Sequence, residues 1–175
     1  PPLKIILSGI LLFLVSLWIR LYYIETTIFL DPIRADAQKY FMLAFNLYNQ
    51  GLYSYATNPP FAPTASIPPG YPTFLYLHFA TTTNLTTIFY AALTTQCILG
   101  SLTVVLLFRL ALSALPYQYA LIFSMIVALT PQFVVFTGYV LTETVFTFFF
   151  IASISAFFQG LKNQRISWML LAGFL

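Results

Sequence analysis

The sequence predicts an all-α polytopic membrane protein, and three observations lead to this prediction. Hydrophobic residues make up 60% of the 175 positions and charged residues only 6%, whereas an ordinary soluble domain carries about 25% charged residues. Residues 85–108 form an uncharged segment that is long enough to cross a bilayer. Five of the charged residues lie within residues 25–39, directly after the first hydrophobic segment. The net charge of +3 is too small and dispersed to indicate nucleic-acid binding.

The hydrophobic segments predict the transmembrane helices in order. We expect spans at about residues 3–27, 85–109, 116–136 and 140–161, and an incomplete one at 166–175, all in a single transmembrane domain. The first span is expected to be an uncleaved anchor because no small-residue cleavage site follows it. Pro131 should break the long uncharged segment that contains it. Because a span needs about 20 residues, we expect the protein to continue beyond Leu175.

Residues 31–84 form the predicted outer loop. Its apolar stretch after Pro72 has only about 12 residues, too few to cross a bilayer, so we expect an interfacial or re-entrant helix there. If this helix does not cross and Lys4 is cytoplasmic, then Arg109, Lys162 and Arg165 are also cytoplasmic, as the positive-inside rule expects. All acidic residues then share the outer face, which indicates a common site there. Chance is the alternative explanation, because the chain has only four acids.

The outer loop begins with a predicted amphipathic helix on the membrane surface. Its apolar positions recur at helical spacing, at Ala37, Tyr40, Phe41, Ala44, Leu47 and Tyr48. Asn46 is among the polar residues that fall off this stripe, and Gly51 is a plausible C-terminal cap. Asp36 falls in the first turn, where a carboxylate is stabilised by free N–H groups, so a simple N-cap is one interpretation of it. The proline-rich segment 58–72 should cross the surface without helix.

Three isolated residues have structural interpretations. His78, in the predicted interfacial helix, is expected to be structural. Cys97 lies within a hydrophobic run and is expected to behave as a buried small hydrophobe. Arg20 interrupts the first span, and we expect its side chain to snorkel to the outer headgroups.

Three segments together resemble a known family. They are ADAQKYFMLAFNLYNQGLYS at 35–54, PPGYPTFLYLHF at 68–79 and TPQFVVFTGYVLTETVFTFFF at 130–150. In this order they resemble the amino-terminal part of GT-C glycosyltransferases of the protein mannosyltransferase and lipid A aminoarabinose transferase type. The glycine that often precedes the family's aspartate is Ala35 here. The resemblance covers most of the chain and implies a GT-C-like helical module with interfacial helices in the first outer loop.

The resemblance also implies a reaction, in which a sugar moves from a polyprenyl-phosphate carrier to an extracytoplasmic acceptor. Asp36 is then the candidate base, and Glu143, at the start of a later helix, is the second catalytic candidate. The candidate substrate-binding residues are Arg34, Lys39, Tyr40 and Tyr71. The implied partners are the polyprenyl-phosphate sugar, membrane lipid and other membrane subunits. No cofactor is fixed, and a divalent metal is left open.

Other interpretations remain open at this point. Arg34 and Lys39 can equally be solvated or contact lipid headgroups, and Glu143 can pair with Arg20 or with a tyrosine hydroxyl. The chain as a whole can be a non-catalytic GT-C-like subunit of a larger membrane complex. A small transporter is disfavoured because the spans lack paired polar interruptions. The expected location is the bacterial inner membrane or its equivalent, with the active loop extracytoplasmic.

Overall fold

The computed structural model describes residues 3–27, 33, 35–82 and 84–175, and every regular element in these residues is helical. Three long helices form the bundle: α1 (Leu3–Thr26), α4 (Leu85–Ala111) and α7 (Glu143–Asn163). Each is long and apolar enough to cross a membrane. The prediction of an all-α polytopic membrane protein is confirmed. The order in which the helices cross stays a prediction.

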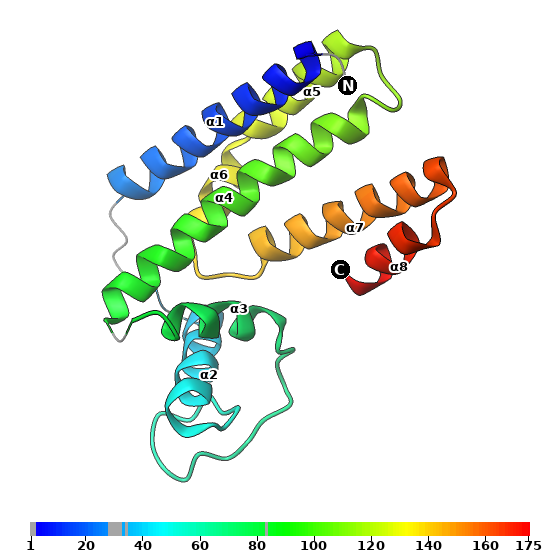
Figure 1. Cartoon of the computed structure of the whole chain (residues 1–175). Helices are drawn as coiled ribbons and strands as arrows, with labels where there is room; N and C mark the ends of the chain where they lie inside the picture. Colours follow the sequence, from blue (N-terminus) through cyan, green and yellow to red (C-terminus); the bar gives the residue numbers. More distant parts are fainter. Residues whose placement is uncertain (1–2, 28–32, 34, 83) are drawn as a thin grey trace.

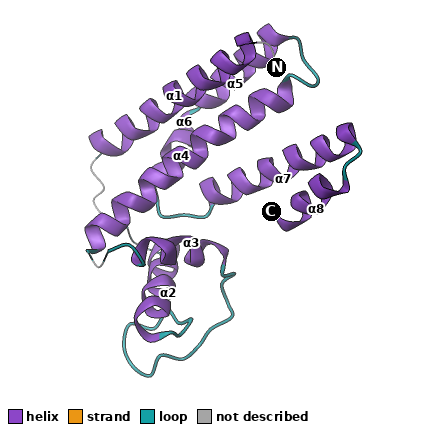
Figure 2. Cartoon of the chain, in the orientation of Figure 1, coloured by secondary structure: helices purple, strands orange, loops and turns teal. Residues whose placement is uncertain are grey.

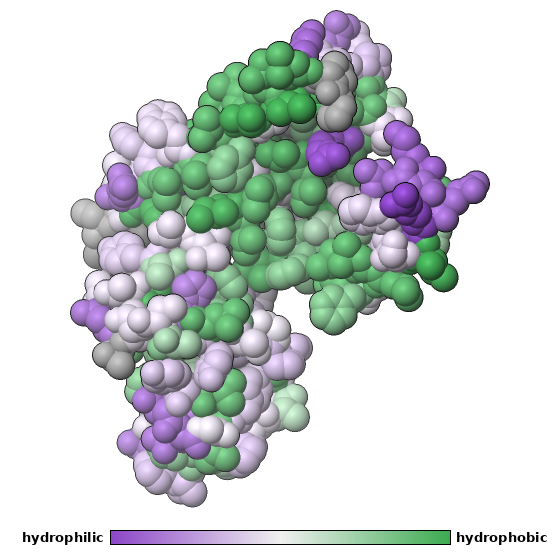
Figure 3. All heavy atoms as spheres, viewed as in Figure 1, coloured by the Kyte–Doolittle hydropathy of each residue, from purple (hydrophilic) through white to green (hydrophobic). Residues whose placement is uncertain are grey.

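Helix α4 is the centre of the bundle and lies between α1 and α7 (Figure 1). Half of its most apolar window is buried, against 17% for α1 and 22% for α7. The two outer helices therefore present long apolar faces outward, including Leu7, Trp18, Phe146 and Phe150. Figure 3 shows this hydrophobic surface over the helices of the bundle, with hydrophilic surface at the turn after α7. Such a distribution is that of a bilayer-embedded bundle.

A broken helix completes the bundle. Helix α5 (Tyr117–Leu129) is followed by α6 (Pro131–Val135) and the short 3-10 helix η1 (Phe136–Gly138), and the pair is bent by 55°. Pro131 occupies the first turn of α6, where its missing N–H is tolerated, so the chain restarts there in a new direction. Helix α8 (Ile166–Phe174) folds back against α7.

Helices α2 (Asp36–Gln50) and α3 (Gly70–Phe79) form a separate lobe at one end of the bundle, and the loop between them contains no regular structure (Figure 2). Aromatic edges join the two helices: the ring centroids of Phe41 and Phe79 lie 5.1 Å apart. At ten residues, α3 is too short to cross a bilayer. Gly51 ends α2 with φ of 66°, as the sequence predicted for a C-terminal cap.

Asn46 of α2 does not follow the predicted helical pattern. Asn46 was predicted to lie off the buried stripe, yet its side chain is buried. Its amide Nδ2 donates to the main-chain oxygens of Ser54 (2.7 Å) and Ala56 (2.9 Å). The prediction is wrong because helical periodicity registers only apolar residues. Here the loop folds back over the helix and needs a buried donor.

Candidate functional site

Asp36 is the first residue of α2, and its carboxylate is exposed. The preceding Ala35 has φ of 54° and ψ of −120°, a conformation that favours glycine, which is the residue the resemblance expects there. Ala35 occupies the N-cap position and Asp36 the first helical position, so the N-cap interpretation of Asp36 is wrong. Instead, its Oδ1 accepts a hydrogen bond from Lys39 Nζ at 3.2 Å.

One turn further along α2, Tyr40 contacts a buried network of hydrogen bonds. Its ring meets that of Tyr71 on α3 edge-on, with centroids 5.3 Å apart. The Tyr71 hydroxyl donates to Gln96 Oε1 at 2.7 Å. Gln96 Nε2 in turn donates to the main-chain oxygens of Thr137 (3.2 Å) and Tyr139 (2.8 Å). This network ties the lobe to α4 and to the segment that leads into α7.

The hydroxyl of Tyr71 is already committed within this network. Burial raises its pKa well above the ordinary value, and the charges of Glu143 and Tyr40 raise it further. Tyr71 therefore stays protonated and donates to Gln96 rather than offering a free hydroxyl to a substrate. Its response to Glu143 also shows that this carboxylate lies near the Tyr40–Tyr71 pair.

Glu143 is the first residue of α7, as Asp36 is of α2, and Thr142 occupies the N-cap position before it. Its carboxylate is exposed and accepts a long hydrogen bond of 3.4 Å from the Thr142 hydroxyl. Both candidate catalytic carboxylates thus belong to the first residue of a helix. The distance between them stays a prediction.

Glu143 also lines a cavity of about 500 Å³ within the bundle. The cavity lies between α1, α4, the broken helix α5–α6 and α7. Its lining residues are Arg20, Gly100, Thr103, Val104, Leu107, Phe123, Val127, Phe133, Phe136, Glu143, Thr144, Thr147 and Ile151. A mostly apolar cavity with a few convergent polar groups is the usual form of a ligand site.

Arg20 lies inside the bundle, and the prediction that it snorkels to the headgroups is wrong. Its side chain is only 1% exposed. Its Nη1 donates to the main-chain oxygens of Ser16 (3.1 Å) and Ala128 (3.5 Å) and to the Ser16 hydroxyl. These acceptors hold the guanidinium between α1 and α5, so it need not leave the bundle. Its Nε has no hydrogen-bond partner among the described residues.

The remaining predicted site residues fare differently. Lys39 is exposed and forms an ion pair with Asp36. Arg34 lies outside the described residues. The ring nitrogens of His78 contact the Phe74 carbonyl oxygen (2.9 Å) and the Thr95 hydroxyl (3.0 Å), which supports a structural role. Within the described residues no group of three or more His, Cys, Asp or Glu side chains could hold a metal.

Sequence reasoning missed two residues of this region. Arg20 could have been recognised as a candidate, because an ionisable residue within a span is a functional hypothesis by default. Gln96 gave no such signal, since one amide in an apolar helix does not reveal which carbonyls it meets.

A known protein family matches most of the chain. The family described as dolichyl-phosphate-mannose-protein mannosyltransferase matches residues 66–175, which is more than half of the chain. The matched region contains Tyr71, Gln96 and Glu143, while Arg20 and Asp36 precede it. No curated protein and no solved structure matches the chain.

Proposed function

Because the chain belongs to the dolichyl-phosphate-mannose-protein mannosyltransferase family of membrane glycosyltransferases, we propose that it transfers a sugar from a polyprenyl-phosphate carrier to an extracytoplasmic acceptor. One observation carries the proposal beyond family membership. Two carboxylates, those of Asp36 and Glu143, belong to the first residue of a helix, and Glu143 lines a cavity that also holds the buried cation Arg20.

The proposed reaction needs a base, and Asp36 is suited to this role. A hydroxyl of the acceptor forms a bond to the anomeric carbon of the sugar and gives its proton to the Asp36 carboxylate. The bond between the anomeric carbon and the phosphate oxygen breaks, and its electron pair leaves with the polyprenyl phosphate. Asp36 is exposed and reachable by an acceptor from water. A positioned base of this kind contributes about 10²–10⁴-fold to the rate.

Glu143 is suited to binding the donor sugar. It lies at the cavity, close enough to Tyr71 to raise the pKa of that phenol. A carboxylate here can accept hydrogen bonds from the sugar hydroxyls while the sugar bridges the cavity and the lobe. We therefore assign Glu143 to orienting the donor sugar, and Asp36 to the proton.

The charge distribution supports the proposed orientation in the membrane. Lys4 and Arg109 lie at the end of the bundle where α1 begins and α4 ends, and Lys162 lies at the end of α7. The lobe with Asp36 and the start of α7 with Glu143 lie at the other end (Figure 1). By the positive-inside rule the basic end is cytoplasmic, which leaves the proposed site extracytoplasmic.

The test of the proposed function is sugar transfer by the Asp36→Asn variant. Protein in vesicles would be given a panel of polyprenyl-phosphate sugars and a membrane extract as the source of acceptor, and transferred sugar would be counted. We expect turnover to fall by about 10²–10⁴-fold, because asparagine keeps the size of the side chain but cannot take the proton. The unfolding temperature should not change, because no cap is lost.

Glu25→Gln is the matched control, since Glu25 is an exposed acid at the same end of the bundle. It should transfer sugar as the wild type does. Near-normal transfer by Asp36→Asn would remove Asp36 from the mechanism. Absence of transfer by the wild type with every donor would overturn the proposed function in favour of a non-catalytic subunit.

A further inference from the structure

The guanidinium of Arg20 is a buried charge without a counter-ion in the described part of the chain. Arginine stays protonated in proteins, so its charge cannot be removed by titration. The ion pair that the described residues do form joins Lys39 to Asp36, not Arg20 to an acid. Main-chain and hydroxyl oxygens accept hydrogen bonds from Nη1. The Nε atom has no hydrogen-bond acceptor among the described residues. A buried ion is costly unless it is paired, so this arrangement favours an incoming anion.

The cavity beside Arg20 has the shape and lining for an apolar molecule with a charged head. Its volume of about 500 Å³ is typical of ligand sites. Phe123, Phe133 and Phe136, from the broken helix, supply an apolar wall. The charged members of its lining are Arg20 and Glu143. An anion would be attracted to Arg20 and repelled by Glu143. The two charges would therefore orient a ligand with its anionic group toward Arg20.

We propose that this cavity binds the prenyl-phosphate part of the donor, with Arg20 holding the phosphate and the phenylalanine wall holding the first isoprene units. The inference rests on the proposed function for the identity of the ligand. The Arg20 guanidinium binds Ser16, which lies ten residues before the end of α1 at Thr26, about 15 Å of helical rise. A phosphate at this depth leaves the sugar on the side of Glu143 and the lobe.

In the transfer step Arg20 would stabilise the leaving group. As the bond between the anomeric carbon and the phosphate oxygen breaks, negative charge grows on that oxygen. A guanidinium can donate two parallel hydrogen bonds to phosphate, and in a water-poor cavity such donors act strongly on developing charge. Arg20, a residue of the first span, would thus supply a cation next to the leaving phosphate.

Gly100 on α4 fixes where the guanidinium can lie. A Cβ atom at this position would lie 2.9 Å from Arg20 Nε and 3.1 Å from Thr137 Cγ2. The first distance is shorter than real Cβ contacts allow, so Gly100→Ala would displace the guanidinium without removing its charge. Gly9 offers a matched control, because a Cβ there would meet Val105 at an ordinary 3.8 Å.

The experiment measures binding of farnesyl phosphate, farnesol and inorganic phosphate to the full chain in detergent. The wild type should bind farnesyl phosphate about tenfold or more tightly than farnesol, since hydrogen bonds to a charged group contribute at least that much. Arg20→Gln should lose this preference and keep its affinity for farnesol. Arg109→Gln, which removes the arginine in the last turn of α4, should bind as the wild type does.

Several results would overturn the inference. Unchanged farnesyl phosphate affinity in Arg20→Gln would do so, as would an equal loss in Arg109→Gln. If Arg20→Gln does not fold, Gly100→Ala must lower the affinity and Gly9→Ala must not, or the inference fails. Equal competition by phosphatidylglycerol vesicles would identify a phospholipid site, and equal competition by inorganic phosphate a free-anion site. Binding is read without turnover, so these failures are distinct from failure of sugar transfer.

Discussion

At the scale of single residues, Tyr71 shows how the site is held together. It touches Tyr40 of the lobe, donates to Gln96 of the bundle and responds to the charge of Glu143. The sequence identified Tyr71 as a substrate-binding candidate from its place in the Pro-Pro-Gly-Tyr-Pro segment. Its hydrogen bond to Gln96 instead supports a role in positioning the groups around it.

The raised pKa of Tyr71 predicts a loss of stability at high pH. In the unfolded chain this phenol loses its proton near pH 10, while burial keeps it protonated in the folded protein. As the pH rises above about 10, the unfolded state binds fewer protons than the folded state, so the free energy of unfolding falls. Between pH 8 and 11 the free energy of unfolding should fall less steeply in Tyr71→Phe than in the wild type. The exposed Tyr55 provides the control, and an identical slope in Tyr55→Phe and Tyr71→Phe would contradict the prediction.

At the scale of elements, α4 joins the parts of the site. Through Gln96 it binds α3 on one side and the segment between η1 and α7 on the other. Glu143 lies four residues after Tyr139, the second carbonyl that Gln96 binds. The position of Glu143 therefore depends on an amide in the middle of a different helix.

Gln96→Leu tests this connection. The substitution leaves the buried Thr137 carbonyl and the Tyr71 hydroxyl without the partner that Gln96 supplies, while the Tyr139 carbonyl keeps the Leu141 N–H. The free energy of unfolding should fall by about 1–3 kcal/mol. Unfolding would be followed by thermal or detergent titration. Thr94→Val, on the exposed side of the same helix, should change it little. Equal stability of the two variants would show that the network does not hold these elements together.

The helices also show which features a sequence can predict. The break at Pro131, the short helix after Gly70 and the αL glycine at Gly51 each follow from local chemistry, and the structure confirms them. Asn46 and Arg20 could not be placed by the same reasoning, because each binds an acceptor outside its own helix. Their acceptors, Ala56 and Ala128, are main-chain oxygens that carry no signal in residue type.

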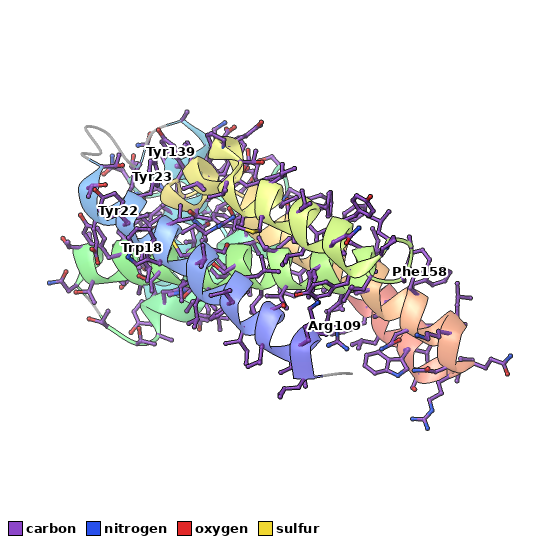
Figure 4. All side chains as sticks on the ribbon, turned by 90° about the horizontal axis from the view of Figure 1, so that it is seen from above. Trp18, Tyr22, Tyr23, Arg109, Tyr139 and Phe158 are labelled. Atoms are coloured by element: carbon purple, nitrogen blue, oxygen red, sulfur yellow. The ribbon has the colours of Figure 1, made fainter. Side chains whose placement is uncertain are left out.

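At the scale of the whole molecule, the charges divide between its two ends. Figure 4 shows Tyr22, Tyr23 and Tyr139 near one end and Arg109 near the other. Lys4 lies 3.9 Å from the centroid of the Tyr117 ring, and Arg109 and Lys162 line one cavity, so three cations share the second end. Targeting favours cations on the cytoplasmic side but hardly acts on acids. The acids at the opposite end are therefore better explained by function than by insertion.

This division predicts which side of the membrane each end faces. We would introduce Asn58→Cys, in the exposed loop of the lobe, and Asn163→Cys, at the exposed end of α7, each into a Cys97→Ala background. The native thiol is buried, so its replacement removes only background labelling. An impermeant maleimide added to intact cells should label position 58, and position 163 only after permeabilisation, because two cations close to Asn163 retain that end in the cytoplasm. Labelling of both positions from the same side would mean that α3 crosses the bilayer or that α7 does not. The proposed site would then no longer be separated from the basic end by the membrane.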